Sequence, residues 1–104
     1  MAGRVRVLSE RLMVPGKEKA VRTLMLNVER NVRNQPGFVK GEILKDVNKP
    51  SSYLILTEWE SMKHLNRWFE TPFYRNIMDE LNATLQEPAS YRILRKAKEE
   101  VFLL

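Results

Sequence analysis

The first regular pattern in this chain is an alternation of apolar and polar residues over 3–13, which is typical of a β-strand. From 17 to about 34 the apolar residues recur every three or four positions, and this spacing predicts a helix with one apolar stripe. Pro36 and Gly37 end that helix, because proline biases its predecessor away from helical geometry and glycine turns freely. The chain therefore begins with a strand followed by a helix.

Three further strands are predicted, over 38–47, 52–60 and 89–97. The segment 46–52 lies between the first two of them and contains Pro50. We expect it to be a flexible excursion, because it is too long for a tight two-residue hairpin.

A broken helix is predicted between the last two strands. Ser61 is a candidate N-cap for a helix to about residue 70, and Thr71-Pro72 restarts the helix, which then continues through 73–86. The resulting order is βαββαβ. It predicts an α+β fold of the ferredoxin-like, split-βαβ kind, with an antiparallel sheet and its helices on one face.

The predicted sheet is apolar on both faces, which a monomer with helices on one face would not need. In the third strand Leu54 and Leu56 point to one side, and Tyr53, Ile55 and Trp59 point to the other. A second copy of the chain is the simplest cover for the face that the helices leave open. We therefore predict a two-fold homodimer through the sheet.

Composition narrows the class of protein. The 104 residues predict one domain over 1–104, with a core at about 4–97 and an apolar-ended tail at 98–104 that either crosses onto a partner or frays. There is no cysteine, no signal-peptide pattern and no apolar run long enough for a membrane span, which favours a cytoplasmic protein without membrane contact. The net charge is +5, but basic and acidic residues are interleaved, so no nucleic-acid partner is predicted.

Three short motifs carry a resemblance to a known family. Pro36-Gly37-Phe38, Trp59-Glu60-Ser61 and Thr71-Pro72 stand at offsets that resemble those of the antibiotic biosynthesis monooxygenase family, and the likeness extends from about residue 4 to 96. The resemblance implies a dimeric α+β barrel with a substrate cavity between the sheet and the helices. Members include oxygenases that need no bound metal or flavin, haem-degrading enzymes and proteins of unknown role.

Trp68 is the residue on which this resemblance bears most, because haem-degrading relatives place a functional tryptophan there. Their iron-ligating histidine falls on Met78, however, and their first-strand asparagine falls on Glu10. Neutral imidazole is the better proximal ligand for haem iron than a thioether. Haem is therefore possible but disfavoured, and we expect no cofactor and no metal. A tryptophan on a helix is also often simply core, so a wall of the pocket and a chemical role both stay open for Trp68.

Glu10 is the second candidate for chemistry. It lies between Leu8 and Leu12 on the strand face that we expect to look toward the helices, and a buried carboxylate must be paired, protonated or facing a wet cavity. One reading is a general base for an acidic phenol or ketone. The other is a structural ion pair with an arginine.

The function predicted from the sequence is a cofactor-independent monooxygenase that acts on a small aromatic or polycyclic substrate, with Glu10 and Trp68 as catalytic residues. The alternative is a non-catalytic dimeric module that binds a small apolar ligand, haem included. An RNA-recognition domain has the same element order, but the third strand lacks its glycine-aromatic signature. The residues predicted to line the pocket are Leu12, Leu24, Val28, His64, Phe73 and Met78.

Overall fold

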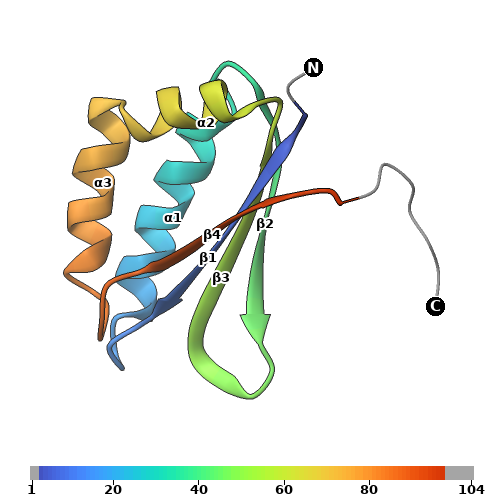
Figure 1. Ribbon diagram of the computed structural model, residues 1–104. Helices are drawn as coiled ribbons and strands as arrows, with labels where there is room; N and C mark the ends of the chain where they lie inside the picture. The colour runs from blue at the N-terminus through green and yellow to red at the C-terminus, as the bar shows by residue number, and fades with distance from the viewer. Residues whose placement is uncertain (1–2, 98–104) are drawn as a thin grey trace.

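The computed structural model describes residues 3–97, which form a four-stranded sheet and three helices (Figure 1). In chain order the elements are β1 Val5–Leu12, α1 Glu18–Val32, β2 Phe38–Asp46, β3 Lys49–Trp59, α2 Met62–Phe69, α3 Pro72–Asn82 and β4 Ser90–Arg95. The predicted βαββαβ order is confirmed, with the second helix divided into α2 and α3. The tail 98–104, predicted to cross onto a partner or to fray, lies outside the described residues.

The strands lie in the order β2-β3-β1-β4, and every neighbouring pair is antiparallel. All three helices lie on one side of this sheet, as Figure 1 shows, so its other side carries no helix among residues 3–97. The ferredoxin-like fold class predicted from the sequence is confirmed. None of the described helices is long and apolar enough to span a lipid bilayer.

Two side-chain caps fix the points at which α2 and α3 begin. Ser61 Oγ accepts a hydrogen bond from the backbone N–H of His64 at 3.3 Å, and Thr71 Oγ1 accepts one from the N–H of Tyr74 at 3.1 Å. Pro72 occupies the first turn of α3, where its missing N–H costs nothing. These caps confirm the predicted helix starts, and they set the positions of the aromatic residues that follow.

The turn between β2 and β3 corrects the prediction of a flexible excursion. Asp46 pairs with Lys49, so only Val47 and Asn48 connect the two strands. The Asp46 carboxylate closes the turn by accepting a hydrogen bond from the Asn48 N–H at 2.8 Å. Pro50 is tolerated in β3 because the pairing with β1 starts only at Ser52, so its missing N–H removes no bond to β1.

The third helix also differs from its predicted extent. It ends at Asn82 rather than near residue 86, because the chain there turns back toward the end of β1. Leu85 forms a β-bridge with Met13, and the Gln86 N–H donates to the Leu12 carbonyl at 2.8 Å.

The core lies between the helices and the sheet, in two neighbouring clusters. The cluster under α2 consists of Val5, Val7, Val32, Trp59, Leu65 and Trp68. The cluster between α1, α3 and the far end of the sheet consists of Met13, Val21, Met25, Ile77 and Leu81. Val28 and Phe73 pack against both clusters, so the region between them is the centre of the helix-covered face.

Candidate active site

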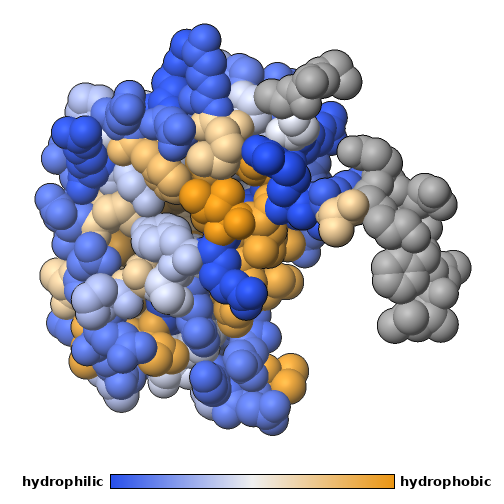
Figure 2. All heavy atoms as spheres, in the orientation of Figure 1, coloured by the Kyte–Doolittle hydropathy of each residue, from blue (hydrophilic) through white to orange (hydrophobic). Residues whose placement is uncertain are grey.

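A small cavity of about 60 Å³ lies between the sheet and the helices, at the junction of the two core clusters. Figure 2 shows apolar side chains gathered in the middle of the face that β4 crosses in Figure 1. Both strands and helices contribute to the cavity wall. Its lining residues are Val7, Ser9, Arg11, Met25, Val28, Val32, Ile55, Thr57, Leu65, Trp68, Phe69, Tyr74, Met78 and Tyr91.

Trp68, from α2, forms an aromatic wall of this cavity. Its ring stacks on Trp59 with a centroid distance of 6.2 Å, and it meets Phe73 at 5.9 Å and the edge of Tyr74 at 5.4 Å. The two tryptophans differ in their polar ends. The Trp59 indole N–H donates to Thr57 Oγ1 at 3.1 Å, whereas the Trp68 N–H makes no hydrogen bond within residues 3–97. Trp68 therefore lines the cavity with its indole N–H uncommitted, whereas the N–H of Trp59 is engaged.

Arg11, from β1, forms the polar end of the cavity, although only 4% of its surface is exposed. Its Nη1 donates to Ser9 Oγ at 2.8 Å, and its Nη2 donates to Tyr91 Oη at 3.2 Å and to Met78 Sδ at 3.3 Å. Its Nε is buried without any partner among the described residues. The guanidinium is thus held by neutral groups only.

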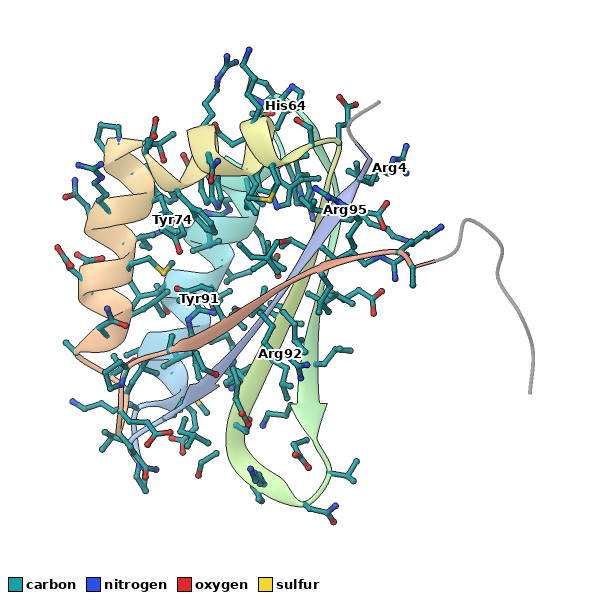
Figure 3. All side chains as sticks on the ribbon, in the orientation of Figure 1. Arg4, His64, Tyr74, Tyr91, Arg92 and Arg95 are labelled. Atoms are coloured by element: carbon teal, nitrogen blue, oxygen red, sulfur yellow. The ribbon has the colours of Figure 1, made fainter. Side chains whose placement is uncertain are left out.

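Two tyrosines continue this polar end toward α3. Tyr74 on α3 donates its hydroxyl to Tyr91 Oη on β4 at 3.1 Å, and Figure 3 shows the two side chains between these elements. Burial raises the pKa of the Tyr74 phenol, the hydrogen bond to Tyr91 raises it further, and Arg11 lowers it by less. Tyr74 is therefore a neutral hydroxyl at physiological pH, suited to donate a hydrogen bond and not to act as a phenolate base.

The structure brings three of the residues predicted for the site together at the cavity, namely Val28, Trp68 and Met78. Leu24 and Phe73 pack against the core instead of lining the cavity. His64 lies at the start of α2, where its Nδ1 is 2.8 Å from Ser61 Oγ; Figure 3 shows it far from Tyr74 and Tyr91.

The predicted placement of Glu10 and Leu12 is wrong. Burial alternates along β1 so that Val5, Val7, Ser9 and Arg11 point toward the helices, and Glu10 and Leu12 point to the open face. The Glu10 carboxylate accepts a hydrogen bond from Ser52 Oγ at 2.8 Å, and it forms no ion pair within residues 3–97. The physical reason is that both faces of β1 carry apolar residues, so alternation alone did not say which one the helices cover.

The sequence reading missed Arg11, Ser9, Tyr74 and Tyr91. A signal for the first of them was present, because Arg11 has the same parity as Val5 and Val7 and interrupts the apolar run on that face. A charged residue on an otherwise apolar strand face is informative when that face is buried. Tyr74 and Tyr91 had no comparable signal, since they come from distant elements that meet only in the fold.

A second cavity, of about 180 Å³, lies on the other side of α1, toward β2. It shares five wall residues with the first: Met25, Val28, Val32, Ile55 and Thr57. These residues form a wall that the two cavities have in common. Within residues 3–97 no group of three or more His, Cys, Asp or Glu side chains is arranged to hold a metal ion.

The sequence model of the antibiotic biosynthesis monooxygenase family matches residues 5–80, so the chain belongs to this family. Among solved structures, it is similar to a conserved protein from Methanosarcina mazei, with a TM-score of 0.87, 18% identity and coverage of 91% of this chain and 94% of that one. No curated protein has a significant match to the sequence.

Two other similar structures carry functional descriptions. The putative antibiotic biosynthesis monooxygenase from Caulobacter crescentus has a TM-score of 0.86 and 17% identity over 93% of this chain and 92% of that one. SnoaB, a cofactor-independent oxygenase from Streptomyces nogalater, has a TM-score of 0.81 and 18% identity over 93% of this chain and 96% of that one. At these identities the likeness establishes the fold, and the family assignment rests on the sequence match.

Proposed function

We propose that this protein is a cofactor-independent monooxygenase that oxidises a small aromatic or polycyclic substrate in the cavity between the sheet and the helices. The observation that carries the proposal is the composition of that cavity, where an aromatic wall meets a buried guanidinium and two tyrosine hydroxyls. Family membership supports oxygenase chemistry, and SnoaB offers a cofactor-independent precedent on the same fold.

Oxygenation without a cofactor requires a substrate that supplies the electrons itself. A hydroxyanthrone is a suitable class, because its ionised form is electron-rich. One O2 is consumed: one oxygen atom becomes the carbonyl oxygen at the CH2 carbon, and the other leaves as water with the two hydrogens. The substrate gives up four electrons and becomes a quinone, so no external reductant is needed.

The residues at the cavity suggest how the protein would favour this reaction. No carboxylate of residues 3–97 lines the first cavity, so the proton of the substrate would leave to water and not to Glu10. Trp68 would form the wall against which the ring of the substrate stacks, and its indole N–H would donate to the substrate or to a developing peroxide oxygen. The Tyr74 hydroxyl donates to Tyr91 Oη and would help to hold Tyr91 beside the substrate.

The space for a polycyclic substrate would come from the second cavity. The first cavity alone is smaller than the few hundred Å³ typical of ligand sites. Met25 belongs to the wall between the two cavities, and methionine is unbranched and changes rotamer readily. A shift of its side chain would join them.

The alternative function, a non-catalytic module that binds a small apolar ligand, uses the same cavity. Haem is the less suitable ligand for it. Met78 Sδ already accepts hydrogen bonds from Arg11 and Tyr91, at 3.3 Å and 3.6 Å, and His64 is engaged at the start of α2. A smaller aromatic ligand, which needs no ligating side chain, would leave these contacts in place.

We further propose that the protein works as a homodimer through the open face of the sheet. Leu8, Leu54 and Leu56 point to this face and are only half-buried, and Leu44 and Leu94 are about as exposed as surface residues, at 40% and 39%. A second copy, related by a two-fold axis, would cover the same leucines on both subunits.

The test of the oxygenase proposal is oxygen uptake by the metal-free protein, treated with a chelator, on 1,8-dihydroxyanthrone, with quinone formation followed by absorbance. We expect uptake of one O2 per quinone formed. We expect kcat/KM to fall by at least about tenfold in Trp68→Phe, a loss of about 1.4 kcal/mol of transition-state stabilisation. The matched control is Trp59→Phe, which alters a buried tryptophan outside the cavity and should keep most of the activity.

Equal losses in the two variants would mean that Trp68 acts only through stability. If the anthrone binds but no oxygen is consumed above the protein-free rate, the binding module is the better description. If the anthrone neither binds nor reacts, the proposed substrate class is wrong.

A further inference from the structure

Arg11 is a buried charge that the fold does not neutralise. Arg11 is 4% exposed, and the partners of its guanidinium are a serine hydroxyl, a tyrosine hydroxyl and a thioether sulfur. Burying an unpaired charge costs several kcal/mol, and a buried N–H without an acceptor adds to that cost. A buried charge without a counterion in the fold is a candidate for contact with a ligand.

No acidic side chain of residues 3–97 forms an ion pair with Arg11. The ion pairs of the described residues join Arg4 and Arg6 to Glu58 on the open face of the sheet. Glu10 is adjacent in sequence but points to that same open face, where it accepts from Ser52. The Arg11 Nε–H is therefore a buried donor without an acceptor, and the described lining of the cavity beside Arg11 contains no carboxylate.

We propose that Arg11 binds the anionic group of an aromatic ligand, a carboxylate or a phenolate, with the ligand ring held between Trp68 and the apolar cavity wall. A guanidinium N–H of Arg11 would donate to one oxygen of the anion, and the Tyr91 hydroxyl, already hydrogen-bonded to Arg11, would be within the same cluster. A planar guanidinium is well matched to a flat oxyanion.

The surroundings favour an organic anion over inorganic phosphate. Apart from the polar cluster at Arg11 and from Thr57, the wall is aliphatic and aromatic, and it includes Val28, Ile55, Leu65 and Trp68. A multiply charged, strongly hydrated ion would lose its water against these groups without replacement. An aromatic ring with one negative charge satisfies both parts of the cavity.

This inference rests on the proposed function in one respect, since the anion would be the ionised substrate of the oxygenase. Stabilisation of a phenolate or enolate by Arg11 would also raise the concentration of the electron-rich form that reacts with oxygen. Binding itself requires no reaction, so it can be measured on unreactive ligands and without oxygen. Failure of oxygenation and failure of anion binding are thus separate results.

The experiment compares benzoate with benzamide, two ligands of nearly the same shape that differ in charge, by isothermal titration calorimetry under nitrogen. We expect the wild-type protein to bind benzoate at least about tenfold more tightly, as a charge-assisted hydrogen bond provides. In Arg11→Met the preference should disappear, while benzamide affinity changes little. Arg11→Lys, which keeps the charge but not the flat fork, should retain part of the preference.

The matched control is Arg22→Met, which makes the same change of net charge at an exposed position of α1 and should leave the preference intact. A second probe, 4-nitrophenol, reports ionisation by its colour: wild type should lower the apparent pKa of the bound probe, and Arg11→Met should not. That arm separates recognition of a phenolate from recognition of a carboxylate.

Circular dichroism of each variant establishes that it is folded. The proposal is overturned if the wild-type protein binds benzamide as tightly as benzoate and leaves the pKa of 4-nitrophenol unchanged. This comparison needs no variant, so it decides the matter even if Arg11→Met does not fold. Retention of the preference in a folded Arg11→Met would also overturn it.

Discussion

Among residues 3–97, the two faces of the sheet each bury one charged side chain, and the surroundings of these two charges are opposite. On the open face the Glu58 side chain is 8% exposed and accepts hydrogen bonds from Arg4 at 3.0 Å and from Arg6 at 2.8 Å. On the helix-covered face Arg11 is 4% exposed and has only neutral partners. A charge with its counterions in place contributes to the fold, whereas a charge left without one is available to a ligand.

The titration of Glu58 shows what complete pairing does. Burial raises the pKa of its carboxyl, but hydrogen bonds from Arg6 and Arg4 outweigh burial, and the pKa lies below its ordinary value. Glu58 is thus ionised at neutral pH and is bound to its counterions.

The largest effect is expected from a charged substitution on the open face of the sheet. Leu54→Glu places a charge among the half-buried leucines of that face, so the proposed dimer should dissociate completely at micromolar concentration. Light scattering coupled to size exclusion would measure the mass. Leu26→Glu, at an exposed position of α1, is the control and should leave the mass unchanged. A wild-type mass of one chain would contradict the dimer outright.

A middle-sized effect is expected from Glu58→Gln. The change removes the charge but keeps the shape, and we expect a loss of about 1 kcal/mol in the free energy of unfolding, because Arg4 and Arg6 are largely exposed and water screens the pair. Thermal denaturation at neutral pH would show a fall of about 5 °C. Glu80→Gln, on the exposed surface of α3, should have almost no effect on the melting temperature. An equal fall in both variants would mean that the ion pairs of Glu58 do not stabilise the fold.

The same pair predicts a pH dependence. Because the pKa of Glu58 is lowered in the folded state, its contribution is fully present above the ordinary value of 4.5 and is lost as the pH falls from there through the folded pKa. The difference in melting temperature between wild type and Glu58→Gln should therefore shrink as the pH is lowered below 4.5. If this difference in melting temperature stays constant until the protein unfolds in acid, the ion pairs of Glu58 do not lower its pKa in the folded state.

The smallest effect on stability is expected from Arg11→Met, although its effect on ligand binding is large. Methionine is of similar length, and it removes a buried charge with no counterion among the described residues. The melting temperature should stay the same or rise. The corresponding gain in the free energy of unfolding should be at most about 1 kcal/mol. Differential scanning calorimetry of the ligand-free protein would measure this. A marked loss of stability would mean that Arg11 serves the fold in the way that Glu58 does.

The elements could be predicted from the sequence because their signals are local. The period of β1 and α1 and the caps Ser61 and Thr71 depend only on neighbouring residues. The site could be predicted only in part. Trp68 reaches the cavity as expected, but Glu10 does not, because the choice between two apolar faces is made by the packing of the helices. The meeting of Arg11 with Tyr74 and Tyr91 is a long-range contact that no local pattern encodes.

The wall shared by the two cavities has a consequence for how the protein could evolve. Met25 on α1 belongs to this shared wall. Among the described residues, it forms no hydrogen bond with Arg11. The length of the chamber and the charge at its end are therefore encoded at separate positions. A single base change at one codon of α1 could alter the size of molecule admitted while its anchoring group stays the same, so related proteins could diverge in substrate and keep one chemistry.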